Sequence, residues 1–389
     1  MSSLRIAIVG GGPAGLALAR LLQVNNIPCA VFELDHTAGE RDQGGTVDLH
    51  KRGGQLVLQE AGLFDEFKRL SRPEGQAMKL LKYDGTVVLD ENTSGIHRPE
   101  EFDDRPEIDR TALRHMLLNS LQPDTVVWGR RLIAVEESPE KAGKHDLHFH
   151  DSVEEGFDLV VGADGAWSKV RASLTDQLPV YSGVTGIELW ATEIEQRHQW
   201  LSEFVGAGSC FMFDEGRAIQ AQKNGNNSIR IYASVRQPED WLETCGIDWS
   251  CPEEAKKKYL DEYFADCAPE LKRAVLDAND KVVPRKMWML PVGWRWDSRP
   301  GLALVGDAAH LMTPFAGVGV NLALADSLTL AKAIVARGGK AERLSDAIAA
   351  YEQEMFPRAE QFAQRTARGL VGHFSANGVE EMAARIAGR

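Results

Sequence analysis

The stretch Ile6-Ala7-Ile8-Val9-Gly10-Gly11-Gly12-Pro13-Ala14-Gly15 decides the fold of this chain. The apolar run that ends at Val9 is typical of a buried parallel strand. Gly10, Gly12 and Gly15 then fit the fingerprint G-x-G-x-x-G, in which the first glycine permits a tight turn and the second lets backbone N–H groups approach a pyrophosphate. The third lets the helix that starts near Pro13 and Ala14 pack closely on the strand, with its N-terminus directed at a phosphate.

An acidic residue ends the next strand-like segment, Cys29–Glu33. A carboxylate in this place accepts hydrogen bonds from ribose hydroxyls, so Glu33 is a candidate ribose ligand. Strand, glycines, helix and acid in this order predict a Rossmann-type dinucleotide-binding unit at the start of the chain. The alternative is a glycine-rich turn that binds nothing.

The size and charge of the chain exclude several classes of protein. Its 389 residues exceed one ordinary core, so two domains are expected. A net charge of -13 disfavours nucleic acid and acidic membrane surfaces as partners. Five cysteines without a CxxC pair favour a reducing compartment. Because glycines interrupt the apolar segment Ile6–Leu22, it is not expected to be a signal peptide, and we expect a cytoplasmic protein without a membrane span.

Hydrophobic periodicity predicts a second, antiparallel sheet within the chain. Phe157–Val161 is expected to be a further buried strand of the parallel sheet. Alternation over Phe211–Phe213, Ala218–Gln222 and Ser228–Val235 predicts the antiparallel sheet, with one polar and one buried face. Lys79–Asp90 is expected to form a hairpin that turns at Asp84-Gly85.

Helical spacing is found at four further places, one of which is Arg110–Leu121, with Leu113, Leu117 and Leu121 on one face. Leu56–Leu70 and Gly319–Val335 are expected to be helices, and Leu344–Phe374 is expected to be a helix that Pro357 kinks or divides. The glycine-rich segment Gly44–Gln55 is expected to be a loop.

Two later motifs identify the dinucleotide. They read Gly162-Ala163-Asp164-Gly165-Ala166-Trp167-Ser168-Lys169-Val170-Arg171 and Gly306-Asp307-Ala308-Ala309-His310. With the glycine fingerprint, their order and separation resemble the class A flavoprotein monooxygenases, the para-hydroxybenzoate hydroxylase group. The resemblance implies FAD as the cofactor, with Asp164 in the second signature and the Asp307 carboxylate on the flavin ribityl chain.

The segment after the third motif leads into a helix. Pro314-Phe315-Ala316-Gly317 is expected to face the substrate, and the N-terminus of the helix at Gly319, Val320 and Asn321 could face the flavin pyrimidine edge. Reduced flavin carries negative charge at this edge, so the helix dipole would favour reduction. The alternative is that Gly317 and Gly319 only form a tight turn.

Three stretches resemble a narrower group, the tetracycline-inactivating flavin monooxygenases. They are Gly44–Lys51, Pro106–Arg110 with Leu113-Arg114, and Gly306–Asn321. The resemblance implies that Glu33, Asp48, Arg110 and Asp307 contact FAD and that Arg41 meets an NADPH phosphate. Cations are plausible phosphate ligands in an acidic protein, and a surface ion pair is the alternative for Arg41 and Arg110.

The predicted antiparallel sheet departs from that group. A histidine and a glutamine that hold tetracycline there align with Arg230 and Glu188, while a family arginine is retained as Arg217. Arg230, Tyr232 and Ser234 should share one face of their strand. If this face lines the substrate site, Arg230 and Arg217 make it cationic and suited to an anionic phenolate, enolate or carboxylate. The alternative is a solvated face on which Arg230 only pairs with Glu188.

The predicted fold is α/β, a Rossmann-type FAD-binding domain with an inserted antiparallel β-sheet substrate domain and a C-terminal bridging helix. The FAD-binding domain is expected at 1–72, 100–175 and 284–340, the substrate domain at 73–99 and 176–283, and the C-terminal helical segment at 341–389.

The resemblance implies a monooxygenase that consumes NAD(P)H and hydroxylates a phenolic, enolic or polyketide-like small molecule, with tetracycline-type antibiotics among the candidates. In its scheme NADPH reduces FAD, O2 adds at flavin C4a, and the distal oxygen passes to an electron-rich carbon. No catalytic side chain and no metal are expected, since His145, His148 and His150 lack completing ligands. The alternatives are a flavin-dependent oxidoreductase, dehydrogenase or halogenase on the same fold, and a FAD-holding binding protein.

Overall fold

The computed structural model describes residues 4–41, 44–93 and 105–387. A five-stranded parallel sheet forms its first layer, in the strand order β17 (Leu302–Leu304), β11 (Leu159–Gly162), β1 (Ile6–Val9), β2 (Ala30–Phe32) and β7 (Val126–Val127). The strands β1 and β11 are buried throughout, as their continuous apolar runs predict.

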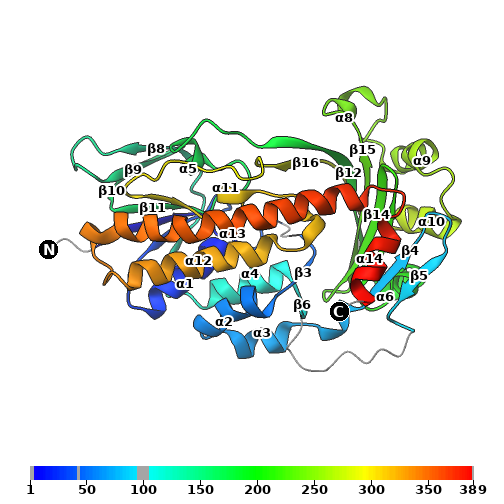
Figure 1. Ribbon diagram of the computed structural model, residues 1–389, viewed down its shortest axis with the longest axis horizontal. Helices are drawn as coiled ribbons and strands as arrows, with labels where there is room; N and C mark the ends of the chain where they lie inside the picture. Colours follow the sequence, from blue (N-terminus) through cyan, green and yellow to red (C-terminus); the bar gives the residue numbers. More distant parts are fainter. Residues whose placement is uncertain (1–3, 42–43, 94–104, 388–389) are drawn as a thin grey trace.

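Helices cover this sheet and bury its apolar face. Helix α1 (Pro13–Val24) packs against α12 (Gly319–Val335), and α12 packs against the 30-residue helix α13 (Leu344–His373). Figure 1 shows α12 and α13 running side by side toward the second sheet. Helix α4 (Arg110–Asn119) also packs on α1.

Helix α13 is continuous through Pro357, so of the two outcomes expected at this proline, a kink or a division, the division is wrong. Proline removes one hydrogen bond of the helix. The residues Ile348, Tyr351 and Met355 bury one face of the preceding turns in the core, and this packing holds the helix across the missing bond.

A seven-stranded sheet forms the second unit. Its strand order is β16 (Lys281–Met289), β12 (Val180–Thr192), β15 (Ser228–Arg236), β14 (Arg217–Asn224), β13 (Ser209–Asp214), β4 (Met78–Leu81) and β5 (Val87–Asp90). All neighbours pair antiparallel except β13 and β4. The predicted hairpin over Lys79–Asp90 is confirmed as β4 and β5, with Gly85 at φ 86° in the turn.

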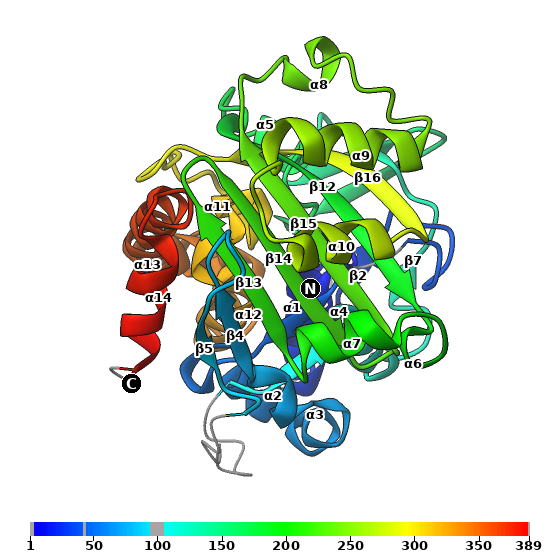
Figure 2. The ribbon, with the colours of Figure 1, turned by 90° about the vertical axis from the view of Figure 1, so that its right-hand side faces the viewer.

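The two faces of this sheet have different neighbours. Ile229, Ile231, Ala233 and Val235 pack under helices, of which the largest is α9 (Pro252–Tyr263). The other helices on this side are α6 (Ile194–Arg197), α7 (Gln199–Val205), α8 (Trp241–Thr244) and α10 (Pro269–Asp277). Figure 2 shows α7, α9 and α10 lying across this outer face. The opposite, inner face is turned toward the first sheet.

Two connecting segments differ from expectation. Within Gly44–Gln55, β3 (Thr46–Asp48) pairs antiparallel with β6 (Glu107–Asp109), and Lys51–Gln55 forms a turn that is kinked at Gly53, so the segment is not a simple loop. The helix expected at 56–70 is two helices, α2 (Leu56–Glu60) and α3 (Phe64–Leu70). Gly62 at φ 70° turns the chain between them.

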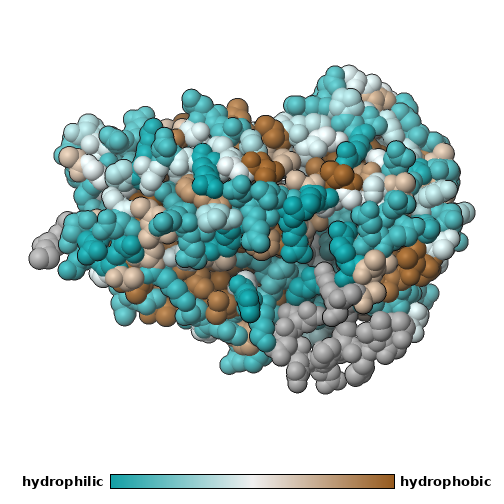
Figure 3. Space-filling view, viewed as in Figure 1, coloured by the Kyte–Doolittle hydropathy of each residue, from teal (hydrophilic) through white to brown (hydrophobic). Residues whose placement is uncertain are grey.

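The smaller elements complete the fold. The sheet of β8 (Leu132–Glu137), β9 (His145–Phe149) and β10 (Val153–Phe157) flanks the short helix α5 (Lys169–Ala172), and α14 (Gly378–Ala387) packs on β13. The face seen in Figure 3 is mostly hydrophilic, with separate apolar patches. Among residues 4–41, 44–93 and 105–387, no helix combines the length and the apolar character that a membrane span requires.

Candidate active site

The glycine fingerprint forms the turn between β1 and α1. A Cβ atom at Gly10, which has φ 107°, would lie 2.3 Å from the carbonyl oxygen of Ala163, so only glycine fits there. A Cβ atom at Gly15 would lie 2.0 Å from the carbonyl oxygen of Gly10. At Gly12 a Cβ atom would meet nothing within 4 Å, so open space lies in front of the loop and the N-terminus of α1. The turn therefore has the shape that a pyrophosphate requires.

Glu33 lies beside this turn at the end of β2. Its carboxylate is buried and accepts hydrogen bonds from the backbone N–H of Gly11 and, at 3.0 Å, from that of Asp35. Arg41 forms ion pairs with Glu33, at 3.0 Å, and with Asp35. The structure thus places Arg41 in the ion pair that the alternative interpretation expected, while 57% of its side chain stays exposed.

One arginine at this site was missed by the sequence reasoning. Arg114 is 2% exposed, and its Nε–H donates to the carbonyl oxygen of Gly11 at 2.9 Å. Its guanidinium also pairs with Asp35 at 3.4 Å. Arg114 stands one turn after Arg110 on α4, and an arginine on the apolar side of that helix was the signal that could have found it.

The second motif is held mainly by its own residues. Asp164 accepts a hydrogen bond from the Ser168 hydroxyl at 2.6 Å and from the Lys169 N–H at 2.7 Å, which closes the turn that begins α5. Burial raises the pKa of Asp164. Arg171 donates to the carbonyl oxygen of Ala308 at 3.0 Å and so joins the second motif to the third.

The third motif presents a carboxylate with no internal partner. After β17, Gly306 adopts φ 62°, and the short helix α11 (Asp307–His310) follows. Asp307 is exposed and accepts no hydrogen bond from any residue that the structure describes. A Cβ atom at Gly306 would lie 3.5 Å from Ala14, so this turn adjoins the start of α1. A free carboxylate there is suited to bind polyol hydroxyls such as those of a ribityl chain.

A buried ion cluster holds this turn in place. Asp326 on α12 accepts the Gly306 N–H at 2.9 Å, contacts His310 through the same oxygen, and pairs with Arg358 of α13 at 3.0 Å. Burial alone would lower the pKa of His310, but the Asp326 carboxylate raises it above its usual value. The pKa of Asp326 is lowered, because its two cations outweigh burial.

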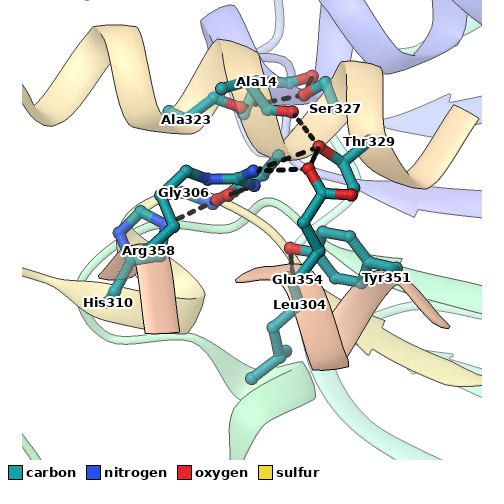
Figure 4. A network of polar contacts seen from close by, with 12 residues as sticks. Ala14, Leu304, Gly306, His310, Ala323, Ser327, Thr329, Tyr351, Glu354 and Arg358 are labelled. Carbon is teal, nitrogen blue, oxygen red and sulfur yellow. Dashed lines mark hydrogen bonds and ion pairs between the residues drawn. The ribbon is translucent and has the colours of Figure 1, made fainter. Parts of the chain in front are cut away.

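Hydroxyl groups extend this cluster to neighbouring elements, as Figure 4 shows. The Tyr351 hydroxyl donates to the carbonyl oxygen of Leu304 at 2.7 Å, and the Ser327 hydroxyl donates to that of Ala14 at 2.8 Å. The end of β17, the start of α1 and the helices α12 and α13 are therefore tied to one another around the Gly306-Asp307 turn.

Asn321 and Asp48 lie together at the start of α12. The Asn321 side chain accepts the N–H groups of His50, at 2.7 Å, and Gly54, at 3.0 Å, and donates to the carbonyl oxygen of Asp48 at 2.8 Å. A Cβ atom at Gly317 would lie 3.9 Å from the Asp48 carboxylate, and one at Gly319 would meet nothing within 4 Å. The first turn of this 17-residue helix, at Gly319 and Val320, thus borders open space.

Arg110 is the first residue of α4 and directly follows β6, the strand that pairs with β3. Its N–H donates to the carbonyl oxygen of Gly45 at 3.1 Å, and a Cβ atom at Gly44 would lie 3.0 Å from its side chain. A Cβ atom at Gly45 would lie 3.5 Å from Arg230 and 3.6 Å from the Tyr232 hydroxyl. The Gly44-Gly45 segment, which leads into β3, is therefore close both to Arg110 and to the inner face of the second sheet.

The inner face carries Glu188 and Arg230, as the alternation predicts. Arg230 and Glu188 are both buried and pair at 3.0 Å, and Arg285 is a second partner of Glu188. The guanidinium of Arg230 also lies 4.3 Å from the ring of Trp190. The predicted pairing of Arg230 with Glu188 is thus present, but the face is not solvated.

Arg217 lies on the other face of the sheet. It alternates with Ile219 and Ala221, which pack under the helices, and it pairs with Asp214 at 2.7 Å and with Asp266. The expectation that Arg217 lines the substrate side is therefore wrong, because the strand period of two points it outward. Phe315, in the 3₁₀ turn η3 (Pro314–Ala316), does pack against the inner face.

In the part of the chain that the structure describes, no group of three or more His, Cys, Asp and Glu side chains could hold a metal ion.

These features define a dinucleotide-binding flavoprotein of the Rossmann type. The chain matches the family described as FAD binding domain over residues 3–366 and belongs to it. It is 32% identical to the monooxygenase penA of Penicillium thymicola over 98% of both chains, and 25% identical to the salicylate hydroxylase of Pseudomonas putida over 92% of this chain and 83% of that one. The tetracycline destructase Tet(55) shares the fold, with a TM-score of 0.73, 19% identity and coverage of 99% and 95%.

The resemblance to class A flavin monooxygenases is thus confirmed, and so is the predicted α/β fold. The chain is an FAD-dependent monooxygenase of the aromatic hydroxylase family.

Proposed function

We propose that this monooxygenase uses NAD(P)H to hydroxylate a phenolic, enolic or polyketide-like small molecule on the inner face of the seven-stranded sheet. The observation that carries the proposal is the Gly44-Gly45 segment, which adjoins the predicted cofactor residue Arg110 and also Arg230 and Tyr232 of the inner face. Bound FAD would relay the reducing equivalents of NAD(P)H to O2, and the chain's residues would hold and orient the reactants.

The residues around the first sheet fit FAD. The open space at Gly12 and the N-terminus of α1 would receive the pyrophosphate, Glu33 the ribose, and the free Asp307 carboxylate the ribityl hydroxyls. Arg110 and Asp48 would contact the cofactor from β3 and α4. The start of α12 at Gly319 would place backbone N–H groups and the positive end of a 17-residue helix at the pyrimidine edge.

Arg41 would serve the nicotinamide cofactor. More than half of its side chain is exposed although it pairs with Glu33 and Asp35, so it could exchange one ion pair for a phosphate of NADPH. Tetracycline-type compounds stay candidate substrates, because tetracycline destructases share the fold.

The test is FAD retention and ligand-stimulated NADPH consumption. We expect the purified protein to be yellow and to consume NADPH faster with a phenolic ligand. Asp307→Ala should raise the Kd for FAD at least tenfold, since a hydrogen bond to a charged group contributes about 1.5–3 kcal/mol. Asp297→Ala is a suitable control, because this exposed acid lies outside the site. A wild-type protein that takes up no FAD would refute the proposal.

A further inference from the structure

The inner face of the seven-stranded sheet changes from apolar to polar along one row of residues. Leu80, Phe211, Gln220, Tyr232 and Glu188 are successive partners across β4, β13, β14, β15 and β12. Partners directly opposite each other point to the same face of a sheet. A molecule lying on this face would therefore meet aromatic and aliphatic groups at one end and polar groups at the other.

The apolar end is built from aromatic and aliphatic side chains, and the guanidinium of the exposed Arg236 lies 5.5 Å from the ring of Phe374 at its margin. Phe211, Phe213 and Phe315 form one buried cluster with Leu80 and Phe374. His373 stacks on Phe213 with ring centroids 4.2 Å apart, and burial lowers the pKa of His373 to about 4. This imidazole is neutral at physiological pH and acts as one more flat ring of the cluster.

The charged groups at the polar end are already paired with one another, since one carboxylate meets two guanidinium groups. Glu188 pairs with Arg230 at 3.0 Å and also with Arg285, whose side chain is 60% exposed to screening water. The guanidinium of Arg230 is also covered by the ring of Trp190. An incoming carboxylate would have to displace Glu188 from Arg230 or lie beside it, and both are unfavourable in a buried setting.

Two uncharged polar side chains stand between these ends. Gln220 and Tyr232 are half-buried on this inward face, and neither their amide nor their hydroxyl forms a hydrogen bond within the described part of the chain. Burial and the nearby Glu188 raise the pKa of Tyr232 to about 12, so its hydroxyl stays a donor. The amide of Gln220 offers both a donor and an acceptor.

Building on the proposed function, we propose that the substrate is a neutral ring compound. Its apolar body packs against the phenylalanine cluster, and an uncharged amide, lactam or ketone edge binds Gln220 and Tyr232. Neutral partners satisfy these two groups without placing a further charge beside Glu188. The site therefore selects against compounds that carry a carboxylate at that edge, and Gln220 and Tyr232 determine the specificity.

A matched pair of ligands tests this proposal on the FAD-loaded enzyme. Salicylamide and salicylate differ only in the neutral or anionic edge, as do 3-hydroxy-2-naphthamide and 3-hydroxy-2-naphthoate. Titrations followed by flavin absorbance should give a Kd at least tenfold lower for the amide of each pair. Gln220→Leu and Tyr232→Phe should each raise the amide Kd by roughly fivefold to tenfold. Neither change should affect carboxylate binding, and Gln59→Leu, at an exposed glutamine of α2, should change neither Kd.

The outcomes separate this proposal from the proposed function. Tighter binding of the carboxylates, unchanged amide binding in both variants, or no flavin perturbation by any of the four ligands overturns the neutral-substrate inference. If the carboxylates bind more tightly and stimulate NADPH consumption, the monooxygenase function stands while this inference fails. A protein that retains no FAD refutes the proposed function itself.

Discussion

Two buried carboxylates, Asp326 in α12 and Glu188 in β12, each pair with two cations, but their surroundings differ. Asp326 is fully buried, and it also accepts a backbone N–H from the turn that presents Asp307. Glu188 accepts only side chains, and its partner Arg285 is largely exposed. The first cluster therefore fixes backbone geometry, whereas the second pairs the charged groups on a face on which a ligand could lie. Similar ion clusters can thus stabilise a backbone turn beside one sheet and determine which ligands bind to the other.

The largest effect is expected at Asp326. Asp326→Asn removes the shared anion, leaves His310 buried without a counter-charge and leaves Arg358 only its exposed carboxylate partner Glu354, which should lower the free energy of unfolding by about 3–5 kcal/mol. Urea unfolding of the FAD-free protein measures it. Asp346→Asn, in an exposed pair with Arg343, is the control and should lose less than about 1 kcal/mol. Equal losses in the two variants would show that the buried cluster has no special structural role.

The prediction for Glu188 is smaller and concerns the ligand. Glu188→Gln keeps the shape of the side chain but leaves Arg230 without its carboxylate, while Arg285 can return to water. The unfolding free energy should fall by about 1–3 kcal/mol, and the preference for salicylamide over salicylate should shrink or reverse. Glu243→Gln, at an exposed partner of Lys286 on the outer face, is the control. A variant that keeps the wild-type preference would show that Glu188 does not exclude anions.

The two sheets also differ in how well the sequence predicts them. Around the first sheet, the motifs constrain the backbone itself: Gly10 and Gly15 leave no room for a Cβ, and the predicted helix Gly319–Val335 agrees with α12 at both ends. A local sequence pattern is enough to predict this region, because the atoms that leave no room for a Cβ belong to the same motif or to the next one. The role of Arg114 was not predicted, because its partners, Gly11 and Asp35, are distant from it in the sequence.

In the second sheet the alternation correctly grouped Arg230 with Tyr232, but it could not say which face Arg217 shares. The single turn between β13 and β14 sets that register, and alignment to a distant family does not fix it. The strand β3 within Gly44–Gln55 was missed for a similar reason. Its partner β6 lies about sixty residues further along the chain, and three-residue strands carry too little alternation to be recognised.

The smallest expected effect is the pH dependence of the Asp326 cluster. His310 has a raised pKa in the folded protein, so its contribution to stability is complete below the ordinary value of 6.5 and is lost as the pH rises through the raised pKa. His310→Gln should remove this dependence. The difference in unfolding free energy between wild type and His310→Gln should therefore decrease from pH 6 to pH 9, as measured by urea titrations at each pH. Burial also raises the pKa of Glu107 to about 8, so ionisation of this carboxyl lowers the stability of both proteins as the pH rises toward 8. The difference between the two proteins removes this shared contribution. A difference that stays constant across this range would mean that His310 is neutral beside Asp326, and that Arg358 alone balances the buried carboxylate.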